Sequence, residues 1–359
     1  MEKKNIVIFI RTLKSGGAEK QSSLLAKALK DSFNVILVVQ RGNFVEEKYI
    51  NFLNTNKVNY ELIKGNLFQR SFSFFKLLKR HNTQIIFSYL TSDNFWSAII
   101  GKMAGVKYLV GGVRSNYLPW HKFQIMKFLN KWVQDYTVFN NNAGFQEFVK
   151  NGFVREKSPI IPNCIDEVPP FQKRANSENI KLLTVARFID GKDHYTAIKS
   201  FHHLINEYSL ETKKIEYTII GHGELEDQIS KWIADYGLEN YISVKINPKN
   251  LMDYYIDCDI YLCASVYEGF SNSIMEAMIC SMPVVATDVG DNDSQVNEGI
   301  TGYIVPPKNH IEIADKLYKL IQSYDNRISF GQAGNELIKT QFSLETFKGR
   351  YLELIDKLK

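Results

Sequence analysis

Short apolar runs alternate with longer amphipathic segments throughout the first half of the chain. The apolar runs cover residues 5–10, 34–39, 84–89, 108–111 and 135–139, and helical patterns fill the intervals between them. Short apolar strands that are separated by helices indicate a parallel sheet covered on both faces. The first half therefore predicts a doubly wound α/β domain.

The second half repeats this alternation and ends in helices. Its predicted strands are residues 181–186, 216–221, 241–245, 259–263, 283–287 and 302–305. Its predicted helices are residues 194–208, 224–236, 311–323, 326–341 and 343–358. A second doubly wound domain follows from this pattern.

A polar stretch with several prolines, residues 161–179, separates the two halves and predicts an interdomain linker. A length of 359 residues agrees with two domains. We place the first domain at residues 1–168 and the second at 169–340. Ligands of such sheets bind at the carboxyl ends of the strands, so we expect functional motifs there and a cleft between the domains.

The charge is unevenly divided between the halves. Residues 1–170 hold 24 Lys and Arg against 12 Asp and Glu, whereas the rest hold 20 against 27. This asymmetry predicts that the first half meets an anionic ligand or surface. The start of the chain does not resemble a signal peptide, and no apolar stretch reaches the length of a membrane span. We therefore expect a cytoplasmic protein, with its four cysteines as free thiols.

The segment EGFSNSIME carries the most informative chemistry. Glu268 follows a predicted strand, and Glu276 lies about two turns into the next helix. Between them, Gly269, Phe270 and Ser271 are expected to present free backbone N–H groups at the start of a helix, an arrangement that binds phosphate. Glu276 lies among apolar residues, so its carboxylate needs a partner, and ribose hydroxyl groups would supply one. The alternative is an ordinary solvated helix glutamate.

Two further loops follow strands and could bind phosphate. Gly16 and Gly17 come after the first strand, where glycine lets backbone approach an anion closely. Arg187 and Lys192 come after the first strand of the second half and suit a diphosphate leaving group. Taken by itself, the loop with Gly16 and Gly17 could equally well be an ordinary turn. Taken by themselves, Arg187 and Lys192 could be an exposed pair of cations without a ligand.

The motifs in their order resemble a known family. R-x4-K at residues 187–192, GxGE at 221–224, E-x7-E at 268–276 and PVVATDVG at 283–290 are similar to the retaining glycosyltransferases of family four, with the GT-B fold. The resemblance covers nearly the whole chain. It implies a UDP-sugar donor, no metal or other cofactor, and a final helix, residues 341–359, that crosses back to the first domain.

The resemblance also implies roles for individual residues. Arg187 and Lys192 would bind the donor diphosphate and act in catalysis with Glu268, which would face the sugar. The leaving phosphate would take the acceptor proton on the front face of the sugar. The remaining donor-binding residues would be Gly16, Gly17, Gly221, Ile246, Gly269, Phe270, Ser271, Asn272 and Glu276, with Glu276 on the ribose and Ile246 at the base.

One departure from the family falls on the first domain. Some relatives have a catalytic-site histidine after the strand at residues 108–111, where this chain has Arg114, followed by Asn116. We assign both residues to the acceptor side. This departure bears on the sugar and acceptor specificity, whereas the fold implied by the resemblance is unaffected.

Basic and aromatic residues in two amphipathic segments, 64–80 and 120–133, suit an anionic membrane surface. A polyprenyl-diphosphate-linked glycan acceptor would explain both features, and would place the protein peripherally on the inner face of the cell membrane. The alternatives are a basic helix packed on its own core, a soluble acceptor, or a binding module without catalysis.

A nucleic-acid partner is not expected, because no recognised motif is present. A sugar-nucleotide epimerase of the same fold should lack the spacing of Glu268 and Glu276.

Overall fold

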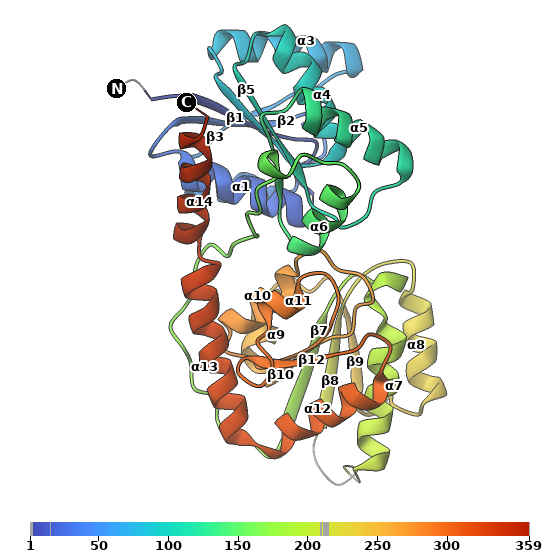
Figure 1. Ribbon diagram of the computed structural model, residues 1–359. Coiled ribbons are helices and arrows are strands. Elements are labelled where there is room, and N and C mark those ends of the chain that lie inside the picture. The colour runs from blue at the N-terminus through green and yellow to red at the C-terminus, as the bar shows by residue number, and fades with distance from the viewer. Residues whose placement is uncertain (1–2, 15, 209, 211–214, 359) are drawn as a thin grey trace. The chain divides into compact units, whose positions relative to one another are not determined.

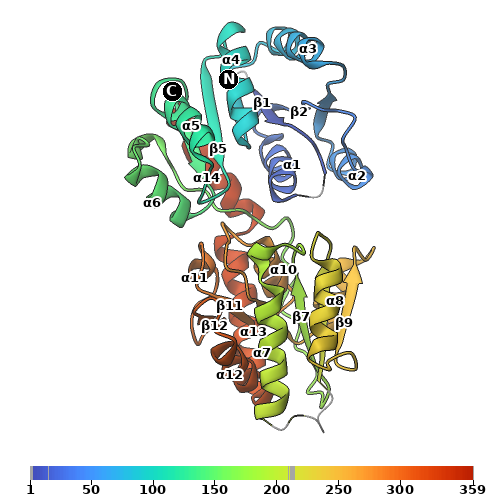
Figure 2. The same cartoon turned by 90° about the vertical axis from the view of Figure 1, so that its right-hand side faces the viewer.

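The computed structural model describes residues 3–14, 16–208, 210 and 215–358, and the chain divides into two compact units (Figures 1 and 2). The first unit runs to Asp166 and takes up the chain again from Phe342, and the second unit is Glu167–Gln341. The units are described separately below. Ser15, within the predicted phosphate loop after the first strand, lies outside the described residues.

The first unit contains a six-stranded parallel sheet in the order β3-β2-β1-β4-β5-β6. Its strands are β1 (Asn5–Ile10), β2 (Asn34–Val39), β3 (Asn59–Leu62), β4 (Ile85–Ser88), β5 (Tyr108–Val113) and β6 (Tyr136–Phe139). Its helices are α1 (Gly17–Leu29), α2 (Glu47–Thr55), α3 (Leu67–Arg80), α4 (Thr91–Met103), α5 (Trp120–Trp132), α6 (Asn142–Lys150) and α14 (Leu344–Asp356), with a 3₁₀ turn η1 (Arg155–Lys157).

The second unit contains another six-stranded parallel sheet, in the order β12-β11-β10-β7-β8-β9. Its strands are β7 (Ile180–Val185), β8 (Ile215–Gly221), β9 (Ile242–Ile246), β10 (Ile260–Cys263), β11 (Val284–Thr287) and β12 (Gly302–Val305). Its helices are α7 (His194–Glu207), α8 (Glu226–Asp235), α9 (Leu251–Asp257), α10 (Asn272–Ile279), α11 (Asn292–Gln295), α12 (His310–Gln322) and α13 (Tyr324–Gln341), with a 3₁₀ turn η2 (Asp190–Lys192).

Both sheets have the strand order 3-2-1-4-5-6 within their own unit, which is that of doubly wound nucleotide-binding folds. The predicted fold class is confirmed. In this order the chain reverses direction across the sheet between the first and fourth strands. The reversal falls between β1 and β4 in the first unit and between β7 and β10 in the second. Ligands bind outside the carboxyl ends of the strands at such a point.

Strand β1 shows why both faces of the first sheet are covered. Ile6, Ile8 and Ile10 pack in the core beneath α1, α2 and α14, while Val7 and Phe9 pack on the opposite face beneath α3 and α4. An uninterrupted apolar run is therefore required in this strand. Figure 1 shows α14, in red, beside α1, and its side chains complete that core.

One strand of the first sheet was not predicted. β3 reads Asn-Tyr-Glu-Leu, pairs only with β2 at the edge of the sheet, and is half-buried or exposed throughout. An edge strand needs fewer apolar residues than a central one, so the apolar pattern that reveals the other strands is missing. No helix in the described part of the chain is long and apolar enough to cross a membrane.

Candidate functional site

The catalytic candidates of the second unit lie on the two strands that flank its reversal point. Arg187 and Lys192 follow β7, and Glu268 follows β10. β7 and β10 are hydrogen-bonded neighbours in parallel register, so their carboxyl ends lie together. The fold thus brings Glu268 to the same edge as Arg187 and Lys192, although it lies 76 residues after Lys192 in the sequence.

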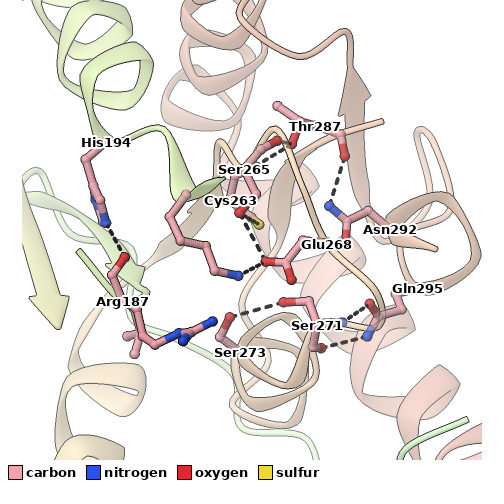
Figure 3. A network of polar contacts seen from close by, with 12 residues as sticks. Arg187, His194, Cys263, Ser265, Glu268, Ser271, Ser273, Thr287, Asn292 and Gln295 are labelled. Atoms are coloured by element: carbon pink, nitrogen blue, oxygen red, sulfur yellow. Dashed lines mark hydrogen bonds and ion pairs between the residues drawn. The ribbon is translucent and has the colours of Figure 1, made fainter. Parts of the chain in front are cut away.

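Lys192 and Glu268 form an ion pair. The ammonium group of Lys192 donates to Oε1 of Glu268, and the same oxygen accepts a hydrogen bond of 3.0 Å from the Ser265 hydroxyl group (Figure 3). The side chains of Lys192 and Glu268 are only 17% and 11% exposed. The Glu268 carboxylate is therefore held in one orientation by two donors from different loops.

Backbone hydrogen bonds fasten these two loops to each other. The carbonyl group of Gly191 accepts from the backbone N–H groups of Val266 and Tyr267, at 3.0 and 3.3 Å. The Thr287 hydroxyl group at the end of β11 donates to the carbonyl group of Ser265 at 2.5 Å. The Lys192–Glu268 pair consequently rests on three adjacent strands.

Gly290 provides space for the loop that carries Glu268. Its φ angle is +62°, in the left-handed region, and a Cβ atom at this position would lie 2.4 Å from the carbonyl oxygen of Glu268. Both the backbone conformation and the close approach require glycine. The glycine in PVVATDVG is thus explained by its contact with the loop that carries Glu268.

The loop after Glu268 is clamped by a buried glutamine. Gln295 of α11 accepts a hydrogen bond of 2.9 Å from the backbone N–H of Ser271, and its amide nitrogen donates to the Ser271 carbonyl oxygen at 2.8 Å (Figure 3). The prediction of a free N–H group at Ser271 is therefore wrong, because the fold supplies an internal acceptor. The Ser271 hydroxyl group lies 3.2 Å from that of Ser273 and remains at the start of α10.

Glu276 lies on α10, and its Oε2 accepts a hydrogen bond of 3.1 Å from the Tyr255 hydroxyl group. Burial, followed by the Glu276 carboxylate, raises the pKa of Tyr255 well above its usual value, so the phenol keeps its proton and remains a donor. The need for a partner was predicted correctly, and the protein itself supplies one. The tyrosine fixes one edge of the carboxylate.

Arg187 differs from Lys192 in being exposed. Its backbone carbonyl group accepts a hydrogen bond of 3.0 Å from Nε2 of His194, which must carry the proton because a carbonyl oxygen only accepts. Burial lowers the pKa of His194, so the ring is neutral at pH 7. In Figure 3 the Arg187 side chain extends toward Ser273 at the start of α10. The buried histidine thus holds the backbone from which an exposed guanidinium group projects.

The remaining donor-site candidates of the second unit have diverse environments. Gly221 ends β8, where a Cβ atom would lie 2.0 Å from the carbonyl oxygen of Ala186, so its glycine allows the β7 loop to approach. Ile246 ends β9 and is 44% exposed. Phe270 is buried, whereas Asn272, the first residue of α10, is half-buried. Gly269 accepts a backbone hydrogen bond of 3.1 Å from Asp291.

In the first unit, Gly16 and Gly17 lie at the start of α1, after the carboxyl end of β1. The Glu19 carboxylate lies against Gly16, where a Cβ atom would be 2.3 Å from Oε2 of Glu19. Its other oxygen, Oε1, accepts a hydrogen bond of 3.2 Å from the Thr12 hydroxyl group. The carboxylate of Glu19 therefore lies beside the predicted phosphate-binding loop.

Arg114 follows β5 and is enclosed by its own unit. Its guanidinium group lies over the Tyr89 ring, 4.4 Å from the ring centroid, and Nη1 donates to Oδ1 of Asn163 at 3.0 Å. Its Nε is buried without a hydrogen-bond partner among the described residues. Asn116, two residues further on, is half-buried and has its Cα 3.3 Å from where a Cβ atom on Gly144 would be. These contacts give Arg114 a structural role in addition to the predicted acceptor role.

Several residues of the site were not predicted from the sequence. Gln295, His194, Tyr255 and Thr287 each fasten a predicted site residue or its loop through one hydrogen bond or more. None of them stands in a short motif with its partner, so spacing gives no signal. Thr287 follows an apolar run, but His194 and Gln295 stand among polar residues, so the local pattern gives no common signal either. In the described residues, no group of three or more His, Cys, Asp or Glu could hold a metal ion.

Comparison with known proteins agrees with this geometry. Residues 166–337, which include Arg187, Lys192, Glu268 and Glu276, match the family model of glycosyl transferases group 1. A solved structure, Anabaena Alr3699/HepE in complex with UDP-glucose, is similar with a TM-score of 0.84 over 98% of this chain and 99% of that chain, at 18% identity. The chain has the fold of a GT-B glycosyltransferase.

Curated relatives extend the similarity beyond the second unit. One is the N-acetylgalactosamine-N,N'-diacetylbacillosaminyl-diphospho-undecaprenol 4-alpha-N-acetylgalactosaminyltransferase of Campylobacter jejuni, 27% identical over 78% of this chain and 80% of that protein. Another is the poly(ribitol-phosphate) alpha-N-acetylglucosaminyltransferase of Staphylococcus aureus, 30% identical over 43% of this chain and 32% of that protein. Together the comparisons support a glycosyltransferase enzyme.

Proposed function

We propose that this GT-B glycosyltransferase transfers a hexose or N-acetylhexosamine from a UDP-sugar to a polyprenyl-diphosphate-linked glycan, with retention of configuration, in the assembly of a surface polysaccharide or glycan. The observation that carries the proposal is the ion pair of Lys192 and Glu268 at the reversal point of the second sheet. A carboxylate held by two donors is an oriented acceptor for sugar hydroxyl groups. The cation beside it lies where a nucleotide diphosphate binds in this class of fold.

In the proposed reaction, the bond between the anomeric carbon and the diphosphate oxygen breaks, and a bond to the acceptor oxygen forms on the same face. The acceptor proton passes to the departing diphosphate. Lys192 has three N–H donors, so it can keep its bond to Glu268 and still donate to the diphosphate. Arg187, exposed at the end of β7, adds a second fixed cation that stabilises the growing negative charge.

The donor nucleotide and its sugar follow from Glu276, Ile246 and Glu268. Glu276 would bind the ribose, Ile246 would contact the uracil, and Glu268 would hold the sugar hydroxyl groups. UDP is favoured because a similar solved structure is described with UDP-glucose. No metal or other cofactor is assigned a role, because Arg187 and Lys192 supply the positive charge that the leaving group needs.

The acceptor is assigned from the first unit and from the Campylobacter relative, whose name gives an undecaprenol-diphosphate-linked acceptor. α3 and α5 carry no Asp or Glu, and they expose Phe68, Phe72, Trp120 and Trp132. Of the aromatic residues predicted for this surface, Phe74 is instead buried and stacked on Phe9. A basic and aromatic face suits an anionic membrane. We therefore place the enzyme peripherally on the inner face of the cell membrane.

A panel of nucleotide-sugars tests the proposal. Thermal shift with each nucleotide-sugar identifies the donor, and transfer from that donor to a polyprenyl-diphosphate-linked sugar is then measured, with the anomeric configuration of the product read by NMR. A UDP-sugar should raise the melting temperature and give a product with the configuration of the donor. An inverted product contradicts retention, and stabilisation by other nucleotides but not by UDP-sugars contradicts the donor assignment. Transfer to a soluble sugar alone would favour the soluble acceptor.

A further inference from the structure

An apolar groove of about 510 Å³ lies between α4 and α5 in the first unit. α4 and α5 pack side by side, and both pack toward the sheet through other residues, such as Ile100 and Met126. The groove opens on their outer faces. Its walls are formed by Phe95, Ala98 and Ile99 of α4 and by Ile125, Phe128 and Leu129 of α5.

The groove side chains are accessible although they are apolar. Phe95, Ile99, Ile125 and Phe128 are between 39% and 59% exposed, and all four lie along the same groove. Scattered exposed apolar residues are normal, but a contiguous set marks a surface that another apolar group covers. The groove therefore calls for an apolar occupant.

The charges beside the groove specify the occupant further. α5 carries Lys122, Lys127 and Lys131 and no acidic residue, and Lys102 of α4 lines the groove itself. The single acidic residue of α4, Asp93, is fully buried. A second copy of the chain would place lysine against lysine at this surface. An apolar chain attached to an anionic head group is complementary to the groove and to Lys122 at the start of α5, whereas Lys102 and Lys131 lie toward the far ends of the helices.

The direction of the groove relates it to the acceptor side. α4 begins just after the carboxyl end of β4, and α5 begins after the loop that follows β5 and contains Arg114 and Asn116. Phe95 lies near the start of α4, and Lys102 lies near its end. The groove thus starts near the edge where doubly wound sheets bind ligands and runs away from it along the helices.

We propose that the groove between α4 and α5 binds the isoprenoid chain of the lipid-linked acceptor, while its diphosphate lies near the start of the helices. This inference rests on the proposed function for the identity of the acceptor. A chain bound in this way adds apolar contacts that a glycan with a short anchor cannot make. The groove consequently selects acceptors by chain length, independently of the glycan.

The test compares two double variants with the wild type. Ile99→Ser with Phe128→Ser removes apolar side chains from the groove. Met103→Ser with Ile311→Ser is the matched control, because these residues are 70% and 50% exposed, do not line the groove and lie outside the aromatic face of α3 and α5. All four changes are at exposed positions, so circular dichroism and the melting temperature should remain those of the wild type.

Two measurements are made on each protein. The first is transfer to acceptors with the same diphosphate-linked glycan and either a long polyprenyl chain or a short alkyl chain. The second is binding to vesicles of neutral lipid with and without added polyprenyl diphosphate. We expect the wild type and the control to prefer the long-chain acceptor in kcat/KM by about tenfold or more, and the groove variant to lose that preference while keeping its short-chain activity.

The outcomes distinguish a failure of the groove assignment from a failure of the proposed function. A groove variant that keeps the chain-length preference overturns the inference and leaves the glycosyltransferase assignment intact. If the groove variant loses vesicle binding equally with and without polyprenyl diphosphate, the occupant is a membrane acyl chain and the inference is wrong. If polyprenyl diphosphate binds through the groove but no glycan is extended, the groove assignment stands and the proposed acceptor reaction fails.

Discussion

Lys192 and Glu268 form an ion pair across two neighbouring loops, one after β7 and the other after β10. Both side chains are largely buried, and Ser265 fixes the same carboxylate oxygen that Lys192 contacts. The pair links the predicted diphosphate-binding cation to the predicted sugar-binding carboxylate. A change at either residue should therefore affect both halves of the donor.

We expect Glu268→Gln and Lys192→Met each to lower kcat by about 10²–10³-fold, since a preorganised charged contact to the reacting group is lost. The double variant should lose less than the product of the two effects, because the residues act together. Steady-state kinetics with the identified donor measures this. Lys181→Met is the matched control, because it removes an ion pair with Asp257 at the opposite end of β7. Fully multiplicative effects would contradict coupling between Lys192 and Glu268.

Arg187 is exposed, so its replacement tests electrostatics with little effect on stability. We expect Arg187→Ala to lower kcat by about 10²-fold and to change the free energy of unfolding by less than about 0.5 kcal/mol. Arg187→Lys should recover part of the activity, because it keeps the charge but loses the forked geometry. Lys231→Ala on α8 serves as the control at an exposed cation outside the site. Unchanged turnover in Arg187→Ala would show that leaving-group stabilisation does not involve this residue.

The sequence predicts the described strands other than β3, and with them the strand ends that carry the candidate residues, because uninterrupted apolar runs are visible locally. β3 escaped because an edge strand tolerates Asn59 and Glu61. The hydrogen bond from the Ser271 N–H to Gln295 was not predicted for another reason. It joins two loops through a single side chain, and the position of that side chain depends on the whole sheet. Similarly, the period of α5 predicts an apolar face, but the burial of Leu129 and the exposure of Phe128 depend on how α4 packs beside it.

A substitution at Arg114 can distinguish a structural role of this residue from a role in acceptor binding. Its guanidinium group lies over Tyr89 and donates to Asn163, so we expect Arg114→Ala to lower the free energy of unfolding by about 1.5–3 kcal/mol. Chemical denaturation measures the loss. Arg114→Lys should recover only part of it, because an ammonium group does not stack as a guanidinium does. If instead stability is unchanged and only the KM for the acceptor rises, the acceptor role predicted from the sequence is the correct one.

Asp93 should make the stability of the protein depend on pH. Its carboxyl group is fully buried in the first turn of α4, where Oδ2 accepts from the backbone N–H of Arg11 at 3.3 Å. Burial raises the pKa of Asp93 to about 7, from an ordinary value near 3.8. Between those values the folded state holds a proton that the unfolded state releases. The free energy of unfolding therefore falls as the pH rises through this range, by about 1.4 kcal/mol for each unit of pKa difference, and levels off above pH 7.

Asp93→Asn removes that titration while keeping an oxygen acceptor for Arg11. Urea unfolding of both proteins between pH 5 and pH 8 should show a shallower slope for the variant, and the variant should be the more stable protein at pH 8. Asp135→Asn is a control at a half-buried carboxylate of the same unit that also accepts a backbone hydrogen bond. Equal slopes for the wild type and Asp93→Asn would show that Asp93 is ionised throughout this range.

Membrane binding through α5 should depend on its lysines. Lys122 and Lys131 are exposed, Lys131 lies 4.9 Å from the centroid of the exposed Trp132 ring, and the helix has no acidic residue to offset them. Each lysine near an anionic surface contributes about 1 kcal/mol, so Lys122→Glu with Lys131→Glu should weaken binding to anionic vesicles by more than about 30-fold. Vesicle flotation with and without anionic lipid measures this, and added salt should weaken wild-type binding.

Lys231→Glu with Lys249→Glu, two exposed positions of the second unit, should bind as the wild type does. Binding that is indifferent to both anionic lipid and the α5 charges would rule out this face as a membrane contact.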